Sequence, residues 1–327
     1  MKNLYYTWIE GLFEVKRYLP QLPVDEFYTF QPDLFNTSRH LETQGEEAFS
    51  FHLYRKDTPE ILAVIHFFKR TDKPEFLSPI RASFGGINCH ENCPDEALYF
   101  LLSCVINTAM VEDQKFITIT NWPSCYNTKL HERLNKIYIT AGFGHFKMQR
   151  NLHIEVGPSL FPQTISGQES RRLNKCKKAG FFAMKEENVP HVTLYNFIQN
   201  SFNEKNYPLS ISESHLLTLF TKFPNEFLLF TVRDQRRLVA VSVAVRINRS
   251  VLYIFLMADL MSYRSFSPGV MLYEELYNYC QKEQITILDQ GISVDNHGDE
   301  KPELIRFKKN MGGKESLKIT YNMVLNN

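Results

Sequence analysis

A short stretch around Ser267 combines the residue types that can hold an anionic ligand. Ser267 is suited to cap a helix, and Pro268 suits the first turn, where a missing N–H costs little. Gly269 leaves the backbone uncovered, so free amides of that turn could face a phosphate or carboxylate group. We therefore expect an anion site at the start of a helix over 267–283, between buried strands at 251–259 and 285–293.

A second cluster, Cys89-His90-x-x-Cys93, contains residue types that bind metals. A tetrahedral site needs further ligands, and no second CxxC or HxxxH pair lies nearby, so we predict no metal. The six cysteines are scattered, which favours reduced thiols and a cytoplasmic location. Charges at Glu10, Glu14 and Lys16 interrupt the N-terminal apolar residues, which predicts neither a signal peptide nor membrane attachment.

A basic stretch lies near the middle of the chain. Ser166 with Glu169 resembles a capping box and Gly180 resembles a helix stop, which predicts a connecting helix over 166–180. Lys and Arg alternate with neutral residues from Arg171 to Lys185, without an acidic residue. Such a helix could bind a polyanion such as tRNA or a cofactor phosphate. The formal net charge of +1 favours a solvated helix face instead.

The elements that would position these groups recur in two halves of the chain. Hydrophobic periodicity and Pro/Gly punctuation predict the order strand, helix, strand, helix, strand in each half. The first half has strands at 60–69, 116–123 and 152–156, with helices from Pro94 and over 128–141. The second half has strands at 238–247, 251–259, 285–293 and 316–325, with helices from Pro268 and Pro302. Two tandem α/β units are the economical explanation, and 327 residues suffice for two domains.

Several motifs in this order resemble the GNAT superfamily of acyl-CoA-dependent N-acyltransferases, particularly Fem-type proteins with two GNAT units. The motifs are SPIRASFGG (78–86), SRRLNKCKKAGF (170–181), SPGVMLYEEL (267–276), ILDQGIS (287–293) and ELIRFKKNMGG (303–313). The resemblance implies an α/β (α+β) fold in which each unit has a mixed, partly splayed β-sheet flanked by helices. We expect a degenerate N-terminal GNAT-like domain over 1–160 and a C-terminal one over 161–327.

The resemblance also implies where a donor would bind. Acyl-CoA, acetyl-CoA among the candidates, would lie between two splayed strands and bind Met257, Ala258, Asp259, Arg264, Ser267, Gly269 and Val270. The family's phosphate loop reads Arg/Gln-x-x-Gly-x-Gly/Ala. Here the residues from Arg264 are Arg-Ser-Phe-Ser-Pro-Gly, so Ser267 replaces the first glycine and Pro268 lacks an amide hydrogen.

The chemistry of a GNAT-type reaction needs a base for the amine and an acid for the leaving group. Asp289 is the candidate base and Tyr273 a candidate acid, although a strand-end carboxylate and a core tyrosine are equally ordinary explanations. His297 could contact an amine substrate, and Arg306 could hold a carboxylate or phosphate, with Arg81 as its counterpart in the first half. Lys308 is a weaker candidate than Arg306.

These features predict an acyltransferase that moves an acyl group from acyl-CoA to an amine of a small molecule, peptide or cell-envelope precursor. Fem-type relatives use aminoacyl-tRNA, a less favoured donor here because the chain is nearly neutral. A catalytically silent tandem GNAT fold that binds a ligand or a partner protein is the alternative. The sequence leaves the acceptor and the oligomeric state open.

Overall fold

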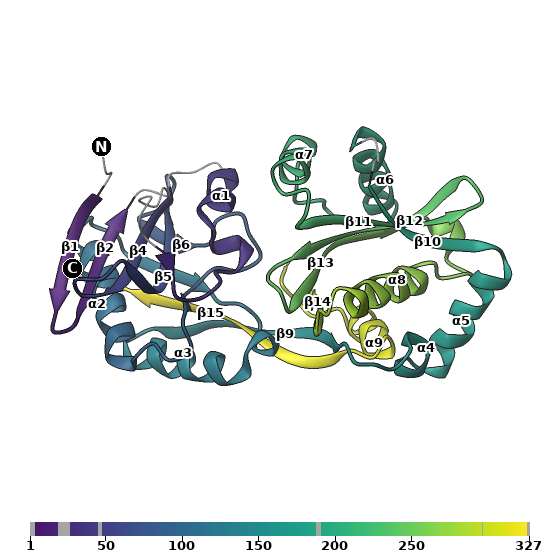
Figure 1. Cartoon of the computed structure of the whole chain (residues 1–327). Helices are drawn as coiled ribbons and strands as arrows, with labels where there is room; N and C mark the ends of the chain where they lie inside the picture. Colours follow the sequence, from purple (N-terminus) through teal and green to yellow (C-terminus); the bar gives the residue numbers. More distant parts are fainter. Residues whose placement is uncertain (1–3, 19–26, 45–47, 188–190, 296, 326–327) are drawn as a thin grey trace. The chain divides into compact units, whose positions relative to one another are not determined.

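The computed structural model describes residues 4–18, 27–44, 48–187, 191–295 and 297–325. The chain forms two compact units (Figure 1). Unit 1 contains residues 1–149 and 317–327, and unit 2 contains residues 150–316. The chain therefore leaves unit 1 once and returns to it with its last strand, which a linear division at residue 160 does not include.

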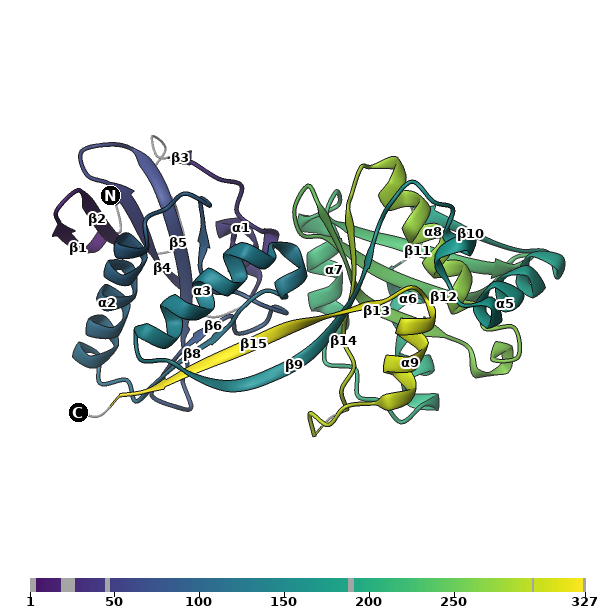
Figure 2. The ribbon, with the colours of Figure 1, turned by 90° about the horizontal axis from the view of Figure 1, so that it is seen from below.

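Unit 1 is a mixed sheet whose helices α2 and α3 lie on the same face (Figures 1 and 2). Its strands follow the order β1-β2-β4-β5-β6-β8-β15. The strands and helices are β1 (Leu4–Glu10), β2 (Phe13–Tyr18), β3 (Phe27–Tyr28), α1 (Ser38–Leu41), β4 (Ala48–Arg55), β5 (Glu60–Lys69), β6 (Glu75–Ser78), β7 (Asn88–Cys89), α2 (Asp95–Val111), β8 (Phe116–Thr120) and α3 (Thr128–Thr140).

Two long strands belong to both units. β9 (Gly144–Glu155) carries the chain out of unit 1, and β15 (Lys314–Val324) carries it back. The first was expected only over 152–156. Its earlier residues 144–148 are exposed, and the polar run Gln149-Arg150-Asn151 interrupts the alternation before 152–156, so the apolar pattern identified only the last part of the strand.

Unit 2 is also a mixed sheet, with the strand order β9-β14-β13-β12-β11-β10. Helices α6 and α7 lie on one face of this sheet, and α5, α8 and α9 lie on the other (Figure 1). Its elements are α4 (Phe161–Thr164), α5 (Gly167–Lys178), β10 (Phe181–Glu186), α6 (His191–Glu204), α7 (Glu213–Lys222), β11 (Phe227–Asp234), β12 (Arg237–Arg246), β13 (Val251–Asp259), α8 (Gly269–Lys282), β14 (Ile287–Ile292) and α9 (Pro302–Asn310). The predicted mixed α/β fold is confirmed.

The central feature of unit 2 is a gap between β13 and β14. These parallel strands pair only at their beginnings, from Val251 with Ile287 to Tyr253 with Asp289. Each strand then bulges, β13 at Phe255 against β12 and β14 at Gln290 against β9. Because a bulge bends its strand and re-aims side chains, the two strands separate and leave part of both edges uncovered. The splayed sheet that the motifs imply is present in this unit.

In unit 1 the corresponding strands, β5 and β8, have another strand between them. β6 pairs antiparallel with β5 through Leu77 and Phe68, and parallel with β8 through residues 75–78. Tyr138 is four residues before Gly142, as Lys308 is four residues before Gly312. The Tyr138 side chain is buried, and its hydroxyl accepts a hydrogen bond from the Ile87 amide at 3.0 Å. Unit 1 thus lacks both the gap and the lysine.

Gly313, which follows α9, has no room for a side chain. A Cβ there would lie 2.4 Å from Gln290 Oε1 and 2.6 Å from the Lys308 carbonyl oxygen. We predict that Gly313→Ala lowers the free energy of unfolding by about 1–3 kcal/mol, because the backbone around Lys308 must shift. Urea denaturation measures this change. Gly157→Ala is the matched control, since no atom lies within 4 Å of its Cβ position. Equal stability of the two variants would contradict the prediction.

Candidate functional site

A cavity of about 950 Å³ occupies the gap in unit 2. Its walls are β13 from Tyr253 to Asp259, β14 from Gln290 to Ile292, the first turns of α5 and α8, helix α9, and the α6–α7 connection. This volume lies within the range of small-molecule sites. The cavity is therefore large enough for two reacting groups to meet beside the uncovered strand edges.

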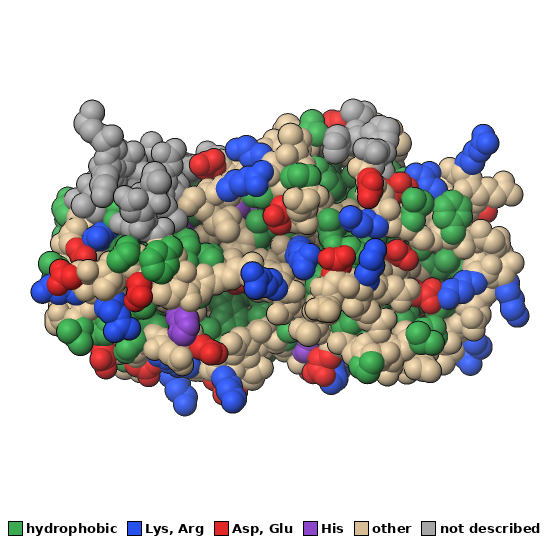
Figure 3. All heavy atoms as spheres, in the orientation of Figure 1, with side chains coloured by type: hydrophobic (Ala, Val, Ile, Leu, Met, Phe, Trp, Pro, Cys, Tyr) green, Lys and Arg blue, Asp and Glu red, His purple; other side chains and the backbone are tan. Residues whose placement is uncertain are grey.

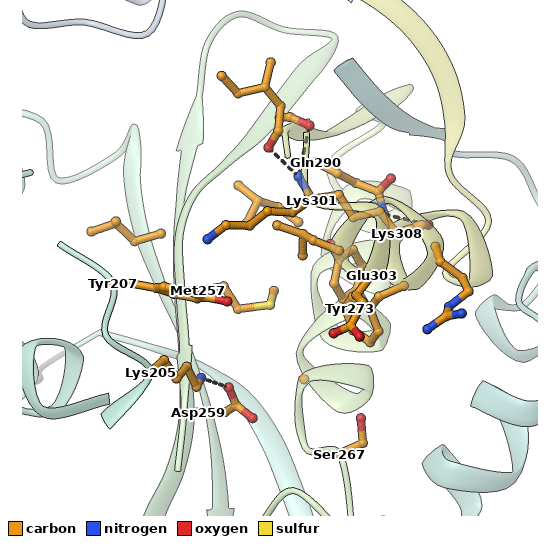
Figure 4. A pocket seen from close by; sticks show the side chains of 18 of the residues that line it. Lys205, Tyr207, Met257, Asp259, Ser267, Tyr273, Gln290, Lys301, Glu303 and Lys308 are labelled. Carbon is orange, nitrogen blue, oxygen red and sulfur yellow. Dashed lines mark hydrogen bonds and ion pairs between the residues drawn. The ribbon is translucent and has the colours of Figure 1, made fainter. Parts of the chain in front are cut away.

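Lys308 is the buried cation of this cavity. Its side chain is on α9, and its Nζ donates hydrogen bonds to the carbonyl oxygens of Gly291 at 3.0 Å and Ile292 at 2.8 Å (Figure 4). Burial lowers the pKa of Lys308 to about 8, while the negative charge of Asp289 acts to raise it. An ammonium group has three donors, so one N–H remains beyond the two carbonyls.

Of the two predicted catalytic residues, Tyr273 lines the cavity and Asp289 does not. Tyr273, on α8, lines the cavity with its buried ring packed against Phe307, and burial raises the pKa of its phenol, which a hydrogen bond from Gln290 partly offsets. The phenol is therefore protonated at neutral pH, and burial makes it a weaker acid than an exposed tyrosine. Asp289 lies outside the lining, and its carboxylate accepts hydrogen bonds from Asn151 Nδ2 and the Gly291 amide, each at 2.8 Å.

The predicted phosphate turn is largely satisfied by its own backbone. Ser267 does not cap α8 as expected: its φ is +59°, and the helix has Pro268 at the N-cap with no side-chain cap. Val270 N donates to the Ser267 carbonyl and Met271 N to the Pro268 carbonyl, at 3.1 and 3.0 Å. Gly269 is left as the first-turn residue whose amide makes no hydrogen bond to another described residue. One amide is a poor cradle for a diphosphate.

The predicted edge positions on β13 have separate environments. Met257 lines the cavity, whereas Ala258 is buried on the other face of the strand, and Val270 on α8 is likewise in the core. Asp259 pairs with Lys205, and its amide and carbonyl are both hydrogen-bonded to the Ser201 hydroxyl. Ser201, on α6, thus occupies the backbone positions of Asp259 that a donor would use.

Positive charge exceeds negative charge around the cavity. Its lining contains six basic and three acidic residues, namely Arg172, Lys205, Arg264, Lys301, Arg306 and Lys308 against Glu169, Asp259 and Glu303. Arg172 pairs with Glu169, and Lys301 lies 3.6 Å from the ring centroid of Tyr207 (Figure 4). Arg264 and Arg306 are exposed, and neither guanidinium pairs with another described side chain. An anionic group is the natural partner for these two residues.

Two predicted substrate-binding residues, His297 and Arg81, are not among the residues that line the cavity. His297 is exposed on the loop before α9, where its amide donates to Asp295 Oδ1 at 2.8 Å. Arg81 belongs to unit 1, so its predicted pairing with Arg306 stays a prediction. Within the described ranges, no group of three His, Cys, Asp or Glu side chains is placed to hold a metal ion. No described helix has the length and apolar character needed to span a bilayer.

Sequence reasoning undervalued Lys308 and missed Gln290 and Glu169 as cavity residues. Ile305, Lys308 and Met311 recur every three residues and are all buried, so a lysine within the apolar stripe of α9 was the available signal. Gln290 depends on the bulge in β14, and the available signal was Gly291, whose φ is +72°, because an isolated glycine within a strand often marks a bulge.

Comparisons with known proteins agree with this geometry. The family model for the acetyltransferase (GNAT) domain matches residues 171–309. The FemX crystal structure is similar at a TM-score of 0.71 and 16% identity, covering 90% of this chain and 92% of that one. A tandem GNAT protein from the clavulanic acid biosynthesis pathway has a TM-score of 0.52 and 8% identity, covering 86% and 83%.

A third similar structure is the C-terminal domain of a protein assigned as a lysylphosphatidylglycerol synthetase from Agrobacterium fabrum. Its TM-score is 0.60 at 11% identity, covering 89% of this chain and 87% of that one. No curated protein matches the chain in sequence. Residues 171–309 are a GNAT domain, and the whole chain has the fold of tandem GNAT and Fem-type proteins. The predicted resemblance is confirmed.

Asp289 and Lys308 provide a direct electrostatic test of the site. We predict that Asp289→Asn lowers the pKa of Lys308 below about 8, because the carboxylate charge that favours the ammonium form is removed. NMR titration of ¹³Cε-labelled lysine measures the shift. Asp295→Asn, on the exposed loop, is the control and should leave the Lys308 titration where it is. An unchanged midpoint in Asp289→Asn would contradict the proposed coupling.

Proposed function

We propose that unit 2 transfers an acyl or aminoacyl group from an activated ester or thioester to an amine, in the cavity between β13 and β14. The observation that carries this proposal is Lys308, a buried ammonium group with two backbone partners and a third N–H available at the open strand edges. The filled position between β5 and β8 supports placing the reaction in unit 2 and treating unit 1 as degenerate.

The reaction joins the amine nitrogen to the carbonyl carbon, and the carbonyl oxygen becomes an oxyanion. Lys308 donates its third N–H to that oxygen, in a site where few water molecules compete. The C–O or C–S bond to the leaving group then breaks. Tyr273 passes its proton to the departing oxygen or sulfur and takes the proton that the attacking nitrogen loses, so amide and protonated leaving group form with no net change in protons. Asp289 keeps Lys308 charged rather than acting on the amine directly.

The acceptor or donor carries an anionic group that Arg264 and Arg306 bind. Guanidinium groups match phosphate and carboxylate oxygens in a bidentate geometry. One structurally similar protein is assigned as a lysylphosphatidylglycerol synthetase. Its name indicates a product of lysine and an anionic lipid, which supports a negatively charged acceptor. A peptide or cell-envelope precursor with a carboxylate or phosphate meets the same requirement.

The donor is either acyl-CoA or an aminoacyl ester such as aminoacyl-tRNA. Acyl-CoA is the donor expected of a GNAT fold. The part of β13 around Met257 and the exposed Arg264 both line the cavity, which supports binding of this donor. The self-bonded first turn of α8, the missing amide of Pro268 and the occupied backbone of Asp259 favour the second donor. Basic residues on α5, among them Arg171 and Lys178, would be available to a nucleic acid.

The two donors separate in a binding experiment. We predict that acetyl-CoA and longer acyl-CoAs at millimolar concentration raise the melting temperature by less than 1 °C, because the turn offers a single amide to the diphosphate. A ligand at a hundred times its Kd adds about 2.7 kcal/mol, a shift of several degrees. An increase of that size with acetyl-CoA would contradict this prediction and restore acyl-CoA as the donor. Mixed aminoacyl-tRNA is the comparison ligand.

Lys308 itself is tested by substitution. We predict that Lys308→Met lowers kcat by about 10²–10³-fold with little change in KM, because the interaction develops with the oxyanion. Wild-type kcat should also fall as pH rises through about 8, where Lys308 loses its proton. Lys309→Met, at the exposed neighbour, is the control. Retained transfer in Lys308→Met, or no transfer by the wild type with either donor, would favour a silent binding module.

A further inference from the structure

Glu169 is a buried carboxylate in the cavity wall with one unused oxygen. It lies in the first turn of α5, where its amide donates to the Ser166 hydroxyl at 3.4 Å. Arg172 Nη1 donates to Glu169 Oε1 at 2.8 Å. Oε2 has no partner among the described residues, although the side chain is only 1% exposed. Glu169 and Arg172 both line the cavity.

This arrangement leaves a strong hydrogen-bond acceptor without a donor. An ionised carboxylate is an acceptor at both oxygens, and burying one oxygen unsatisfied costs free energy. Arg172 cannot neutralise the site as fully as a buried partner would, because its own side chain is 40% exposed. A donor entering from the cavity would remove the penalty.

Gln290 is a second unsatisfied acceptor in the same cavity. Its Nε2 donates to the Lys308 carbonyl at 3.2 Å, which fixes the amide orientation and leaves Oε1 as the free acceptor. Oε1 is buried without a partner among the described residues, and the residue is 3% exposed. A Cβ on Gly313 would lie 2.4 Å from this Oε1, so the atom faces the Gly313 backbone, which leaves Glu169 Oε2 as the acceptor considered for a ligand.

We infer that Glu169 binds a primary ammonium group of a substrate. A carboxylate selects a cation over a neutral hydroxyl, and an ammonium group supplies the N–H donor that Oε2 lacks. Arg264 and Arg306 would bind an anionic group of the same substrates. The inference rests on the proposed transfer reaction, because that reaction identifies which substrate carries the ammonium group. The group belongs either to an aminoacyl donor or to the acceptor amine in its protonated form.

Small probes test the ammonium site without knowledge of the substrates. L-alaninamide has a primary ammonium group, and N-acetyl-L-alaninamide has lost it. We expect the full chain to bind L-alaninamide at least ten-fold more tightly in isothermal titration at pH 7. Glu169→Gln should abolish that preference, because it removes the charge but keeps the shape. Equal affinity for the two probes, or no binding of either, overturns the inference.

The control is Glu186→Gln. Glu186, on β10, is another mostly buried glutamate, and it pairs with Arg233 on β11. This variant should keep the preference for L-alaninamide. If Glu169→Gln still prefers L-alaninamide over N-acetyl-L-alaninamide, Glu169 only positions Arg172, and the inference is overturned. Melting temperatures identify variants that do not fold. If Glu169→Gln is among them, Glu169→Asp replaces it and should reduce the preference, because the charge remains but its reach is shorter.

Transfer assays then locate the source of the ammonium. If the acceptor supplies it, Glu169→Gln raises KM for the amine. If the donor supplies it, the variant loses the discrimination between a glycyl and an acetyl thioester of coenzyme A. The two proposals fail separately. Probe binding through Glu169 without any turnover would contradict the proposed transferase function. Turnover that depends on Lys308, without a preference for the ammonium probe, would contradict only this inference.

Discussion

The hydrogen bonds from Lys308 to the Gly291 and Ile292 carbonyls are the interaction on which the site depends. Where β14 separates from β13, its carbonyls lose the ladder partner that a closed sheet would supply. Buried carbonyls need donors, and water would otherwise have to enter. A lysine from α9 provides two of them, so the same side chain holds the gap open and brings a positive charge to it.

The opposite side of the gap is satisfied in a similar way. Ser201, from α6, hydrogen-bonds both the amide and the carbonyl of Asp259 at the end of β13. Helices on the two faces of the sheet therefore complete the backbone pairing that the splayed strands lack. This arrangement stabilises an open cavity, but it also takes up backbone groups that an extended ligand would use.

The two units show how small local differences decide between a cavity and a filled core. Each contains the series helix, strand, helix, strand, as α2-β8-α3-β9 or α8-β14-α9-β15, and the second helix of each series is followed by a glycine with positive φ, Gly142 or Gly312. In unit 1 the short strand β6 lies between β5 and β8, and the Tyr138 hydroxyl accepts a hydrogen bond from the Ile87 amide. On the face of the molecule in Figure 3, basic and acidic side chains are interspersed.

The sequence alone determined the order of the elements and the tandem organisation, because these depend on local periodicity, Pro and Gly. Arg306 and Tyr273, two of its candidate site residues, lie on predicted helices and line the cavity, and their roles stay predictions. Tertiary structure decided the rest. Bulges at Phe255 and Gln290 accompany the gap, the Ser166 amide donates to the Asn310 carbonyl and so ties the start of α5 to α9, and burial lowers the pKa of Lys308. The contact between α5 and α9 and the burial of Lys308 depend on residues far apart in the chain, which local periodicity does not encode.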